Sequence, residues 1–412
     1  MNSLPQELVD RVIDWACLPT APTKEEELTS NKTARACSLV RFSWNRRSRQ
    51  KLFRAVSLNP ERLVRWCENI PNSASGPSSF VRMLSLERLT ADHLLQHIEH
   101  IEAFKHIAIL YLGFFDDETF DQEKIERCFG HFGPTVHFLS FLFPQCKASL
   151  FPRLLGLFTR AIRIDINMPH IIQDVDETEY KPLPNLELLG LGLEQNASID
   201  YELLEACTNL RAACISCPRS TARFWFNHLF IRCADTLESV LIGPEYQGKF
   251  ESYSHAQGFL ANLSYFTNTD PIEYVLPVPD DIPLATHWSM AQCANIRDLD
   301  VAVEPKGPGA LAEEIITSAP IAKLRSICLI FDCKVKADFS SRVKFEAWEA
   351  LESHLCYVAD KKLKKDPPER FAVTIFFTPH AKKYIMKDGG EVRLGKFLDG
   401  LQRRGVLEVK VS

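Results

Sequence analysis

Apolar residues at the start of the chain recur at intervals of three and four. They are Leu4, Leu8, Val9, Val12, Ile13 and Ala16. This spacing places them on one face of a helix, which we expect to begin near Ser3 and to end near Pro19. A polar linker, residues 19–32, then leads to a second predicted helix, residues 33–55, which carries a strongly basic face.

From residue 80 the spacing changes to apolar, two residues, apolar, one residue, apolar. The copies are Val81/Leu84/Leu86, Ile107/Leu110/Leu112, Val136/Leu139/Phe141, Ala161/Ile164/Ile166, Leu186/Leu189/Leu191, Leu210/Ala213/Ile215, Leu237/Val240/Ile242, Ile296/Leu299/Val301, Leu324/Ile327/Leu329, Ala372/Ile375/Phe377 and Val406/Val409/Val411. The last two apolar residues of each copy are two apart, as on the buried face of a strand. The first seven copies begin 24 to 29 residues apart.

Helix-like stretches lie between these strands, for example residues 91–105, 121–132, 200–207 and 344–365. A strand and a helix in every 20–29 residues is typical of leucine-rich-repeat geometry. We therefore predict an α/β solenoid with parallel strands on its concave face and helices on its convex face. An irregular α/β domain with parallel strands is the alternative. The interval between Leu237 and Ile296 is about two periods and predicts one further repeat.

The net charge of −5 is too small and too mixed to indicate nucleic acid as the main partner. The start of the chain lacks the long apolar run of a signal peptide, and no stretch is apolar enough to span a membrane. We therefore expect no membrane partner and a place in the cytoplasm, the nucleus or both. The thirteen Cys residues lack the spacing of a disulfide framework, which favours reduced, buried thiols.

Three short segments carry a family resemblance. They are Leu4-Pro5-x-Glu7-Leu8 with Val12-Ile13, then Cys37-Ser38-Leu39-Val40 with Ser43-Trp44, and Leu52-Phe53 with Val56. In this order they resemble an F-box domain. The resemblance covers residues 1–58, so the predicted domains are an F-box at 1–58 and a leucine-rich-repeat-like region at 59–412. The combination is similar to F-box proteins with divergent repeats that are abundant in mushroom-forming fungi.

F-box proteins are substrate receptors of cullin-RING ubiquitin ligases. The resemblance implies that the F-box docks on a Skp-type adaptor and that the repeats select a protein substrate. The adaptor-binding residues it implies are Leu4, Pro5, Glu7, Leu8, Val12, Ile13, Leu39 and Val40. Trp44 is expected inside the domain. The chain departs from the family in its long acidic linker and in repeats that lack a regular Asn or Cys after each strand.

Residues beside the apolar strand positions should point away from the helices. Among them we select the candidate substrate contacts Glu87, Tyr111, Asp165, Asp298 and Asp300. The carboxylates of the four acidic residues would favour a basic segment of the substrate. The alternative is that these acids only form a solvated face of the sheet.

No constellation of residues predicts catalysis, a metal or a cofactor, so we expect a non-catalytic receptor. A ligase-independent scaffold with an F-box-like fold is the first alternative. A nucleotide-binding enzyme is the second, because Gly243–Lys249 has the spacing of a phosphate-binding loop; Phe250, however, stands where Ser or Thr should bind magnesium.

Three smaller patterns have ordinary structural interpretations. Cys214 and Cys217 lack the second pair that a zinc site needs. His93, His97 and His100 would share one solvated helix face. The basic run 361–365 complements the end of a helix, with nuclear import as its alternative interpretation.

Overall fold

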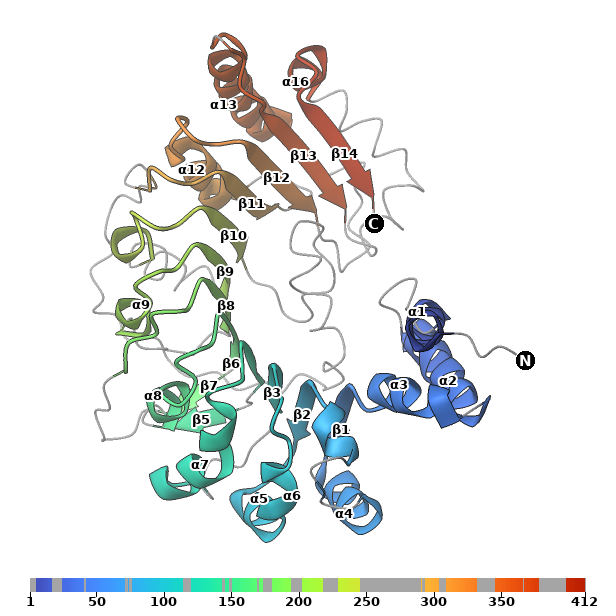
Figure 1. The fold of residues 1–412 in the computed structure, drawn as a ribbon. Coiled ribbons are helices and arrows are strands. Elements are labelled where there is room, and N and C mark those ends of the chain that lie inside the picture. The colour runs from blue at the N-terminus through green and yellow to red at the C-terminus, as the bar shows by residue number, and fades with distance from the viewer. Residues whose placement is uncertain are drawn as a thin grey trace. The chain divides into compact units, whose positions relative to one another are not determined.

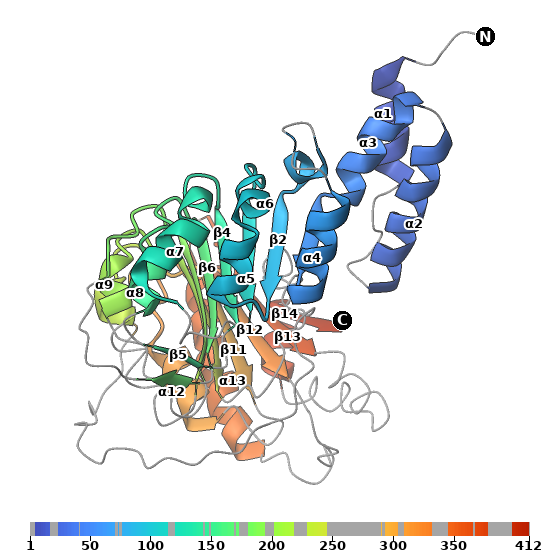
Figure 2. The ribbon, with the colours of Figure 1, turned by 90° about the horizontal axis from the view of Figure 1, so that it is seen from below.

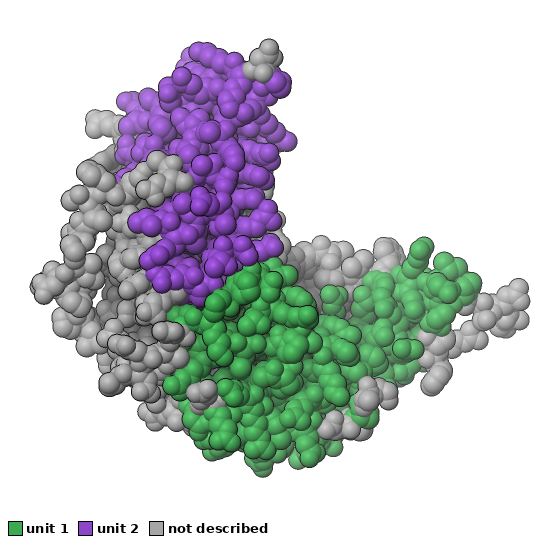
Figure 3. Space-filling model, turned by 60° about the vertical axis from the view of Figure 1, so that its left-hand side comes forward, with its two compact units in different colours: residues 1–185 green, residues 186–412 purple. Residues whose placement is uncertain are grey.

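The fold is described from a computed structural model. The residues described are 5–16, 24–40, 42–70, 73, 76–113, 120–142, 145–147, 150–168, 170–172, 180–193, 202–217, 229–244, 290, 293–303, 309–331, 345–365, 367–377 and 398–411. The chain divides into two compact units, Met1–Asn185 and Leu186–Ser412, coloured green and purple in Figure 3. Both contain parallel strands with helices along one face (Figure 1). The predicted α/β class with parallel strands is thereby confirmed.

Three helices open the first unit: α1 (Gln6–Ala16), α2 (Lys24–Val40) and α3 (Phe42–Leu52). The apolar face of α1 contributes Val9 and Ile13 to a small core with Ala34 and Cys37 of α2. Trp44 and Leu52 of α3 pack against this core, as expected for Trp44. The three helices therefore enclose their own apolar centre.

The second predicted helix was placed wrongly at both of its ends. Helix α2 begins at Lys24, inside the stretch predicted as a linker, because Lys and Glu are good helix formers despite their charge. It ends at Val40, and α3 is a separate helix. The long acidic linker noted in the sequence is therefore largely helical.

The sheet of the first unit has parallel strands in chain order. They are β1 (Ala55–Leu58), β2 (Met83–Glu87), β3 (Ile109–Gly113), β4 (Phe138–Leu142) and β6 (Arg163–Met168), with a separate small pair β5 (Gln145–Lys147) and β7 (His170–Ile172). The sheet begins with β1, which pairs with β2. The strand array therefore starts at Ala55, within the region assigned to the F-box; Phe53, Val56 and Leu58 form a first, overlooked copy of the motif.

Helical segments follow the strands of this unit along one face of the sheet (Figure 2). They are α4 (Pro60–Asn69), η1 (Pro77–Phe80), α5 (Ala91–Gln96), α6 (Ile98–Glu102), α7 (Gln122–Phe129), η3 (Gly130–Phe132) and α8 (Leu150–Leu155). Polar caps fix where three of them begin. The side chains of Asn59, Thr90 and Asp121 accept hydrogen bonds from backbone N–H groups in the first turns of α4, α5 and α7.

The second unit repeats the arrangement with strands again in chain order. They are β8 (Leu188–Leu193), β9 (Ala212–Cys217), β10 (Ser239–Pro244), β11 (Asp298–Val303), β12 (Ser326–Phe331), β13 (Ala372–Phe377) and β14 (Leu407–Val411). The helices α9 (Glu202–Ala206), α12 (Gly309–Ser318), α13 (Phe345–Leu363) and α16 (Asp399–Arg403) accompany them. The further repeat predicted between Leu237 and Ile296 lies outside the described residues.

The apolar motif forms continuous rows across the strands. In the second unit, Leu189, Ala213, Val240, Leu299 and Ile327 lie side by side and are buried. The predicted register is confirmed from β2 to β12. It is wrong for the last two strands, where Val373 and Leu407 continue this row. Their motifs would begin at Arg370 and Arg404, and these charged residues concealed the correct register.

A further buried position lies three or four residues before seven of the motifs. It is Phe104, Phe132, Phe158 and Leu183 in the first unit, then Cys207, Cys233 and Cys293 in the second. Burial raises the pKa of the Cys233 thiol to about 11, so this residue packs as a small neutral side chain. The expectation of reduced, buried cysteines is confirmed for these three.

Candidate functional site

The apolar face of helix α1 is only partly buried. Val9 and Ile13 are buried in the core, whereas the side chains of Leu8 and Val12 are 46% and 47% exposed. Pro5 and Glu7 are exposed beside them, and Leu4 lies outside the described residues. Of the adaptor contacts on this helix that the resemblance implies, Ile13 is fully buried in the three-helix core and is not accessible to a partner.

A second apolar pair lies at the end of α2. Leu39 is 86% exposed and Val40 is 61% exposed. The turn that carries them is held by two bonds: Ser38 Oγ donates to the carbonyl oxygen of Arg35 (2.7 Å), and Asn45 Nδ2 donates to that of Ser38 (3.4 Å). Exposed Leu and Val side chains on helices are the groups that a partner's apolar surface would cover.

An ion-pair cluster ties α1 to α3 and so fixes the exposed face of α1. Arg47 donates twice to the Asp14 carboxylate, at 2.9 and 2.6 Å, and Lys51 Nζ lies 3.1 Å from it. The hydrogen bond from Arg47 is the main reason that the pKa of Asp14 is lowered. The cluster is about one-third exposed, so solvent screens its contribution to stability.

The predicted substrate contacts of the first unit are bonded or packed within the sheet face opposite the helices. Ser57 Oγ and Ser85 Oγ both donate to Glu87, at 2.8 and 3.1 Å. Tyr111 and Asp165 lie in one row across β3, β4 and β6, and both side chains are buried. Their expected exposure to a substrate is therefore not observed, while Glu87 keeps partial exposure.

Asp165 is engaged by a neighbour on its own strand. Arg163 donates to both of its carboxylate oxygens, with a shortest distance of 2.6 Å, and the guanidinium lies 4.4 Å from the centre of the Phe138 ring. Burial raises the pKa of Asp165, and the Arg163 charge acts in the opposite direction. Tyr111 packs edge-on against the same Phe138 ring. These contacts stabilise the sheet from the side opposite the helices.

The two predicted contacts on β11 keep partial exposure. Asp298 accepts a hydrogen bond of 2.6 Å from Ser326 Oγ. Asp300 lies between Leu241 and Cys328 in the sheet. Burial, and secondarily the charge of Asp298, raises the pKa of Asp300 to about 7. Its environment thus disfavours a negative charge, which a cationic group of a partner would reverse.

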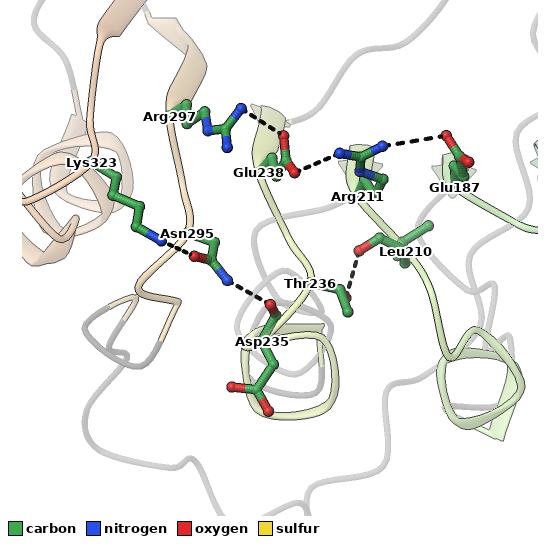
Figure 4. A network of polar contacts seen from close by, with 9 residues as sticks. All are labelled: Glu187, Leu210, Arg211, Asp235, Thr236, Glu238, Asn295, Arg297 and Lys323. Carbon is green, nitrogen blue, oxygen red and sulfur yellow. Dashed lines mark hydrogen bonds and ion pairs between the residues drawn. The ribbon is translucent and has the colours of Figure 1, made fainter.

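A polar ladder that the sequence analysis missed crosses the second unit, one residue before each strand (Figure 4). Arg211 reaches Glu187 at 4.0 Å and Glu238 at 2.8 Å, and Arg297 reaches Glu238 at 3.3 Å. The charges therefore alternate from β8 to β11. The detectable signal was a charged residue at the same place in four successive copies of the motif.

Polar side chains also bridge the turns of neighbouring repeats. Asn185 Nδ2 donates to the carbonyl oxygen of Thr159 at 2.9 Å, and Asn295 Nδ2 donates to that of Asp235 at 2.6 Å. Thr236 Oγ1 makes a related bond of 2.7 Å to the carbonyl oxygen of Leu210, the first residue of the preceding motif (Figure 4). Both Asn residues directly precede the first apolar residue of a motif. The repeats thus have a regular polar bond, located before the strand rather than after it.

The remaining candidates acquire structural roles or fall outside the described residues. Gly243 belongs to the end of β10, and residues 245–249 are not among those described. His93 caps α5, where its Nδ1 accepts from the backbone N–H of Thr90 at 3.2 Å. The helix predicted over 91–105 is divided at His97, so the three His residues do not share one helix.

The basic run near the end of α13 is not uniformly exposed. Lys362 is buried, and its Nζ donates to the carbonyl oxygen of Ala322 (2.8 Å) and to Glu369 (2.6 Å). Lys365 also pairs with Glu369. At least one Lys of the run therefore holds the helix end in place and is not presented to an import receptor.

Comparison with models of known protein families and with curated protein sequences finds no match to the chain. Within the described residues, no group of three or more His, Cys, Asp or Glu side chains is arranged to hold a metal ion. No helix in that part of the chain combines the length and apolar character that a membrane span requires.

Proposed function

We propose that this chain is a substrate receptor of a cullin-RING ubiquitin ligase. Helices α1–α3 dock on a Skp-type adaptor, and the strand repeats bind the protein substrate. The chain itself performs no chemistry and instead brings the substrate close to the ligase. Ligase-independent scaffolding remains the alternative, since it would use the same two surfaces without an adaptor.

The observation that carries this proposal is the exposed apolar face of α1. The side chains of Leu8 and Val12 are nearly half exposed. Val9 and Ile13 of the same helix are buried in the core of the three helices. A helix needs only one apolar face to fold against its neighbours. Leu8 and Val12 form the part of this face that lies outside the three-helix core, and this exposed part suits a partner. The motif residues that resemble an F-box supply part of this face.

Among the candidate substrate contacts, we favour the two acids on β11. Tyr111 and Asp165 are buried, which leaves Asp298 and Asp300 as the more accessible acids of the predicted set, with Glu87 bonded to two Ser side chains. A Lys or Arg side chain of the substrate would pair with Asp300 and lower its raised pKa. We therefore propose that β11 contributes to recognition of a basic segment.

The test is co-purification of the full chain with a Skp-type adaptor. We expect Leu8→Asp/Val12→Asp to abolish binding, because two carboxylates would enter an apolar interface. The matched control is Val64→Asp, which charges an exposed Val on α4, outside the three helices. Both variants should keep the wild-type circular dichroism spectrum. Undiminished binding by the double variant would contradict the proposed docking surface, and failure of the wild-type chain to bind any adaptor would favour the scaffold.

A further inference from the structure

Strand β14 is the last described strand in the sheet of the second unit. It pairs with β13 on one side, and no other described strand pairs with it on the other. Val409 continues a row whose members Val301, Leu329 and Ile375 are fully buried, yet Val409 is 41% exposed. At this edge, the side chain of Val409 is exposed, whereas the corresponding side chains of the interior strands are buried.

The register with β13 shows which backbone groups of β14 point away from the sheet. The carbonyl oxygen of Val406 accepts a hydrogen bond from the N–H of Val373 in β13. Because backbone groups alternate in direction along a parallel strand, those of residues 408 and 410 also face β13. The N–H and C=O groups of residues 407, 409 and 411 then face away from the sheet and are available for another strand.

The sequence of β14, Leu-Glu-Val-Lys-Val, is complementary to itself when it is reversed about Val409. In an antiparallel pair of two copies, Glu408 of each would lie opposite Lys410 of the other, and Val409 would lie opposite its own copy. The outward backbone groups of 407, 409 and 411 would meet as hydrogen-bonded pairs. Pairing centred on Glu408 or on Lys410 would instead oppose identical charges.

We propose that a second copy of this chain docks on β14 in antiparallel orientation, centred on Val409, to form a symmetric dimer with a continuous sheet. Charges on an edge strand also discourage indiscriminate pairing, and Lys410 Nζ lies 3.2 Å from Glu408 within one chain. In the dimer, each Glu408 would pair with Lys410 of the other copy in place of Lys410 of its own chain, so the number of ion pairs stays the same. The gain comes from the new backbone hydrogen bonds and the covered Val409.

The expected dimer is weak, because a single pair of short strands buries less area than stable complexes do. We expect a dissociation constant on the order of 10 μM, measured by sedimentation equilibrium of the full chain. Lys410→Glu places like charges opposite each other twice and should weaken the dimer about ten-fold or more. Glu408→Lys/Lys410→Glu restores opposite charges and should restore the dimer, which a general loss of folding would not do.

Three results would overturn the proposal: a wild-type chain that stays monomeric up to about 100 μM, a dimer that Lys410→Glu leaves unchanged, or a charge exchange that fails to restore dimerisation although the variant is folded. Unchanged circular dichroism and melting temperature of each variant establish that folding is intact. The adaptor plays no part in this experiment, so its outcome is independent of the proposed ligase function.

Disulfide trapping tests the register separately. In the proposed pairing, the Cα atoms of the two Val409 residues would be about 5.5 Å apart, within the range of about 4.4–6.8 Å that a disulfide spans. Val409→Cys should therefore form a covalent dimer under mild oxidation, with the linked peptide identified by mass spectrometry. The control Glu408→Cys faces Lys410 of the second copy and should cross-link much less. Equal cross-linking of the two variants would contradict the register.

Discussion

Helices α1–α3 and the strand repeats use their apolar residues differently. In the repeats, the interior strands bury their motif residues almost completely, as in the row from Leu189 to Ile327. In the helices, Val9 and Ile13 form a small core, while Leu8, Val12, Leu39 and Val40 remain exposed. The repeats therefore use apolar residues for their own stability. The helices carry more of them than their core requires, as the proposed docking surface would need.

The largest expected effect tests this difference directly. Leu299→Ala and Leu189→Ala should each lower the free energy of unfolding by roughly 2–5 kcal/mol, because each leaves a cavity in a packed row. Leu8→Ala and Leu39→Ala should change it much less, by about 0.5 kcal/mol, since Leu8 is nearly half exposed and Leu39 is 86% exposed. Urea unfolding of the four variants provides the measurement. A large loss at Leu8 would show that α1 needs this residue for folding.

A second prediction concerns the dependence of stability on the ionisation of Asp300, in the strand repeats. The pKa of Asp300 is raised to about 7, so the unfolded chain loses this proton more readily and stability falls as pH rises from about 4 towards 8. Asp300→Asn should therefore stabilise the chain at pH 8, on the order of 1–3 kcal/mol, and have little effect near pH 4. Thermal melts at the two pH values measure this. Equal effects at both would exclude the raised pKa as the cause.

Asp14 should show the opposite dependence on pH. Its folded-state pKa is lowered from 3.8, mainly by the hydrogen bond from Arg47, so its contribution is present at neutral pH and is lost as pH falls through that lowered value. Asp14→Asn should destabilise the helices slightly at pH 7 and progressively less in acid. The effect should be smaller than at Asp300 because the cluster is partly solvated. Melting of Asp14→Asn between pH 7 and 3 tests the sign.

The smallest expected effect concerns the ladder of charges in the second unit. Arg211→Ala removes the links to Glu187 and Glu238, which are exposed or partly exposed. Such exposed pairs contribute little to stability, and salt weakens them further. Denaturation at low and high salt should therefore give a difference between wild type and variant that shrinks with added salt. A loss as large as that of Leu299→Ala would mean that the ladder, rather than the apolar rows, holds the repeats together.

The repeats could be predicted from the sequence because the same apolar spacing recurs many times. Each further copy supports the strand assignment of the others. The register failed at β13 and β14, where Arg370 and Arg404 occupy the first position of the motif and the apolar pattern alone pointed two residues too far. The exposed side of α1 was harder to predict. Spacing alone cannot separate Leu8 from Val9 or Val12 from Ile13, because which side of α1 faces the core depends on the other two helices.

The burial of side chains on the sheet face opposite the helices could not be predicted from the sequence either. Alternation along a strand indicates that Tyr111 and Asp165 point away from the helices, and the register confirms their common row. It does not indicate what covers them or that Arg163 would bond Asp165 from the same strand. The polar bonds from Asn185 and Asn295 were missed for a related reason, since their partners lie in the preceding repeat.

The central claim is that the excess apolar residues of α1 and α2 bind an adaptor. Hydrogen–deuterium exchange of the full chain, with and without a purified Skp-type adaptor, tests it most directly. The account predicts slower exchange in peptides covering Gln6–Ala16 and Lys24–Val40 when the adaptor is added, and no change in β8–β12. Binding that protects the strand repeats while leaving both helices unchanged would contradict it.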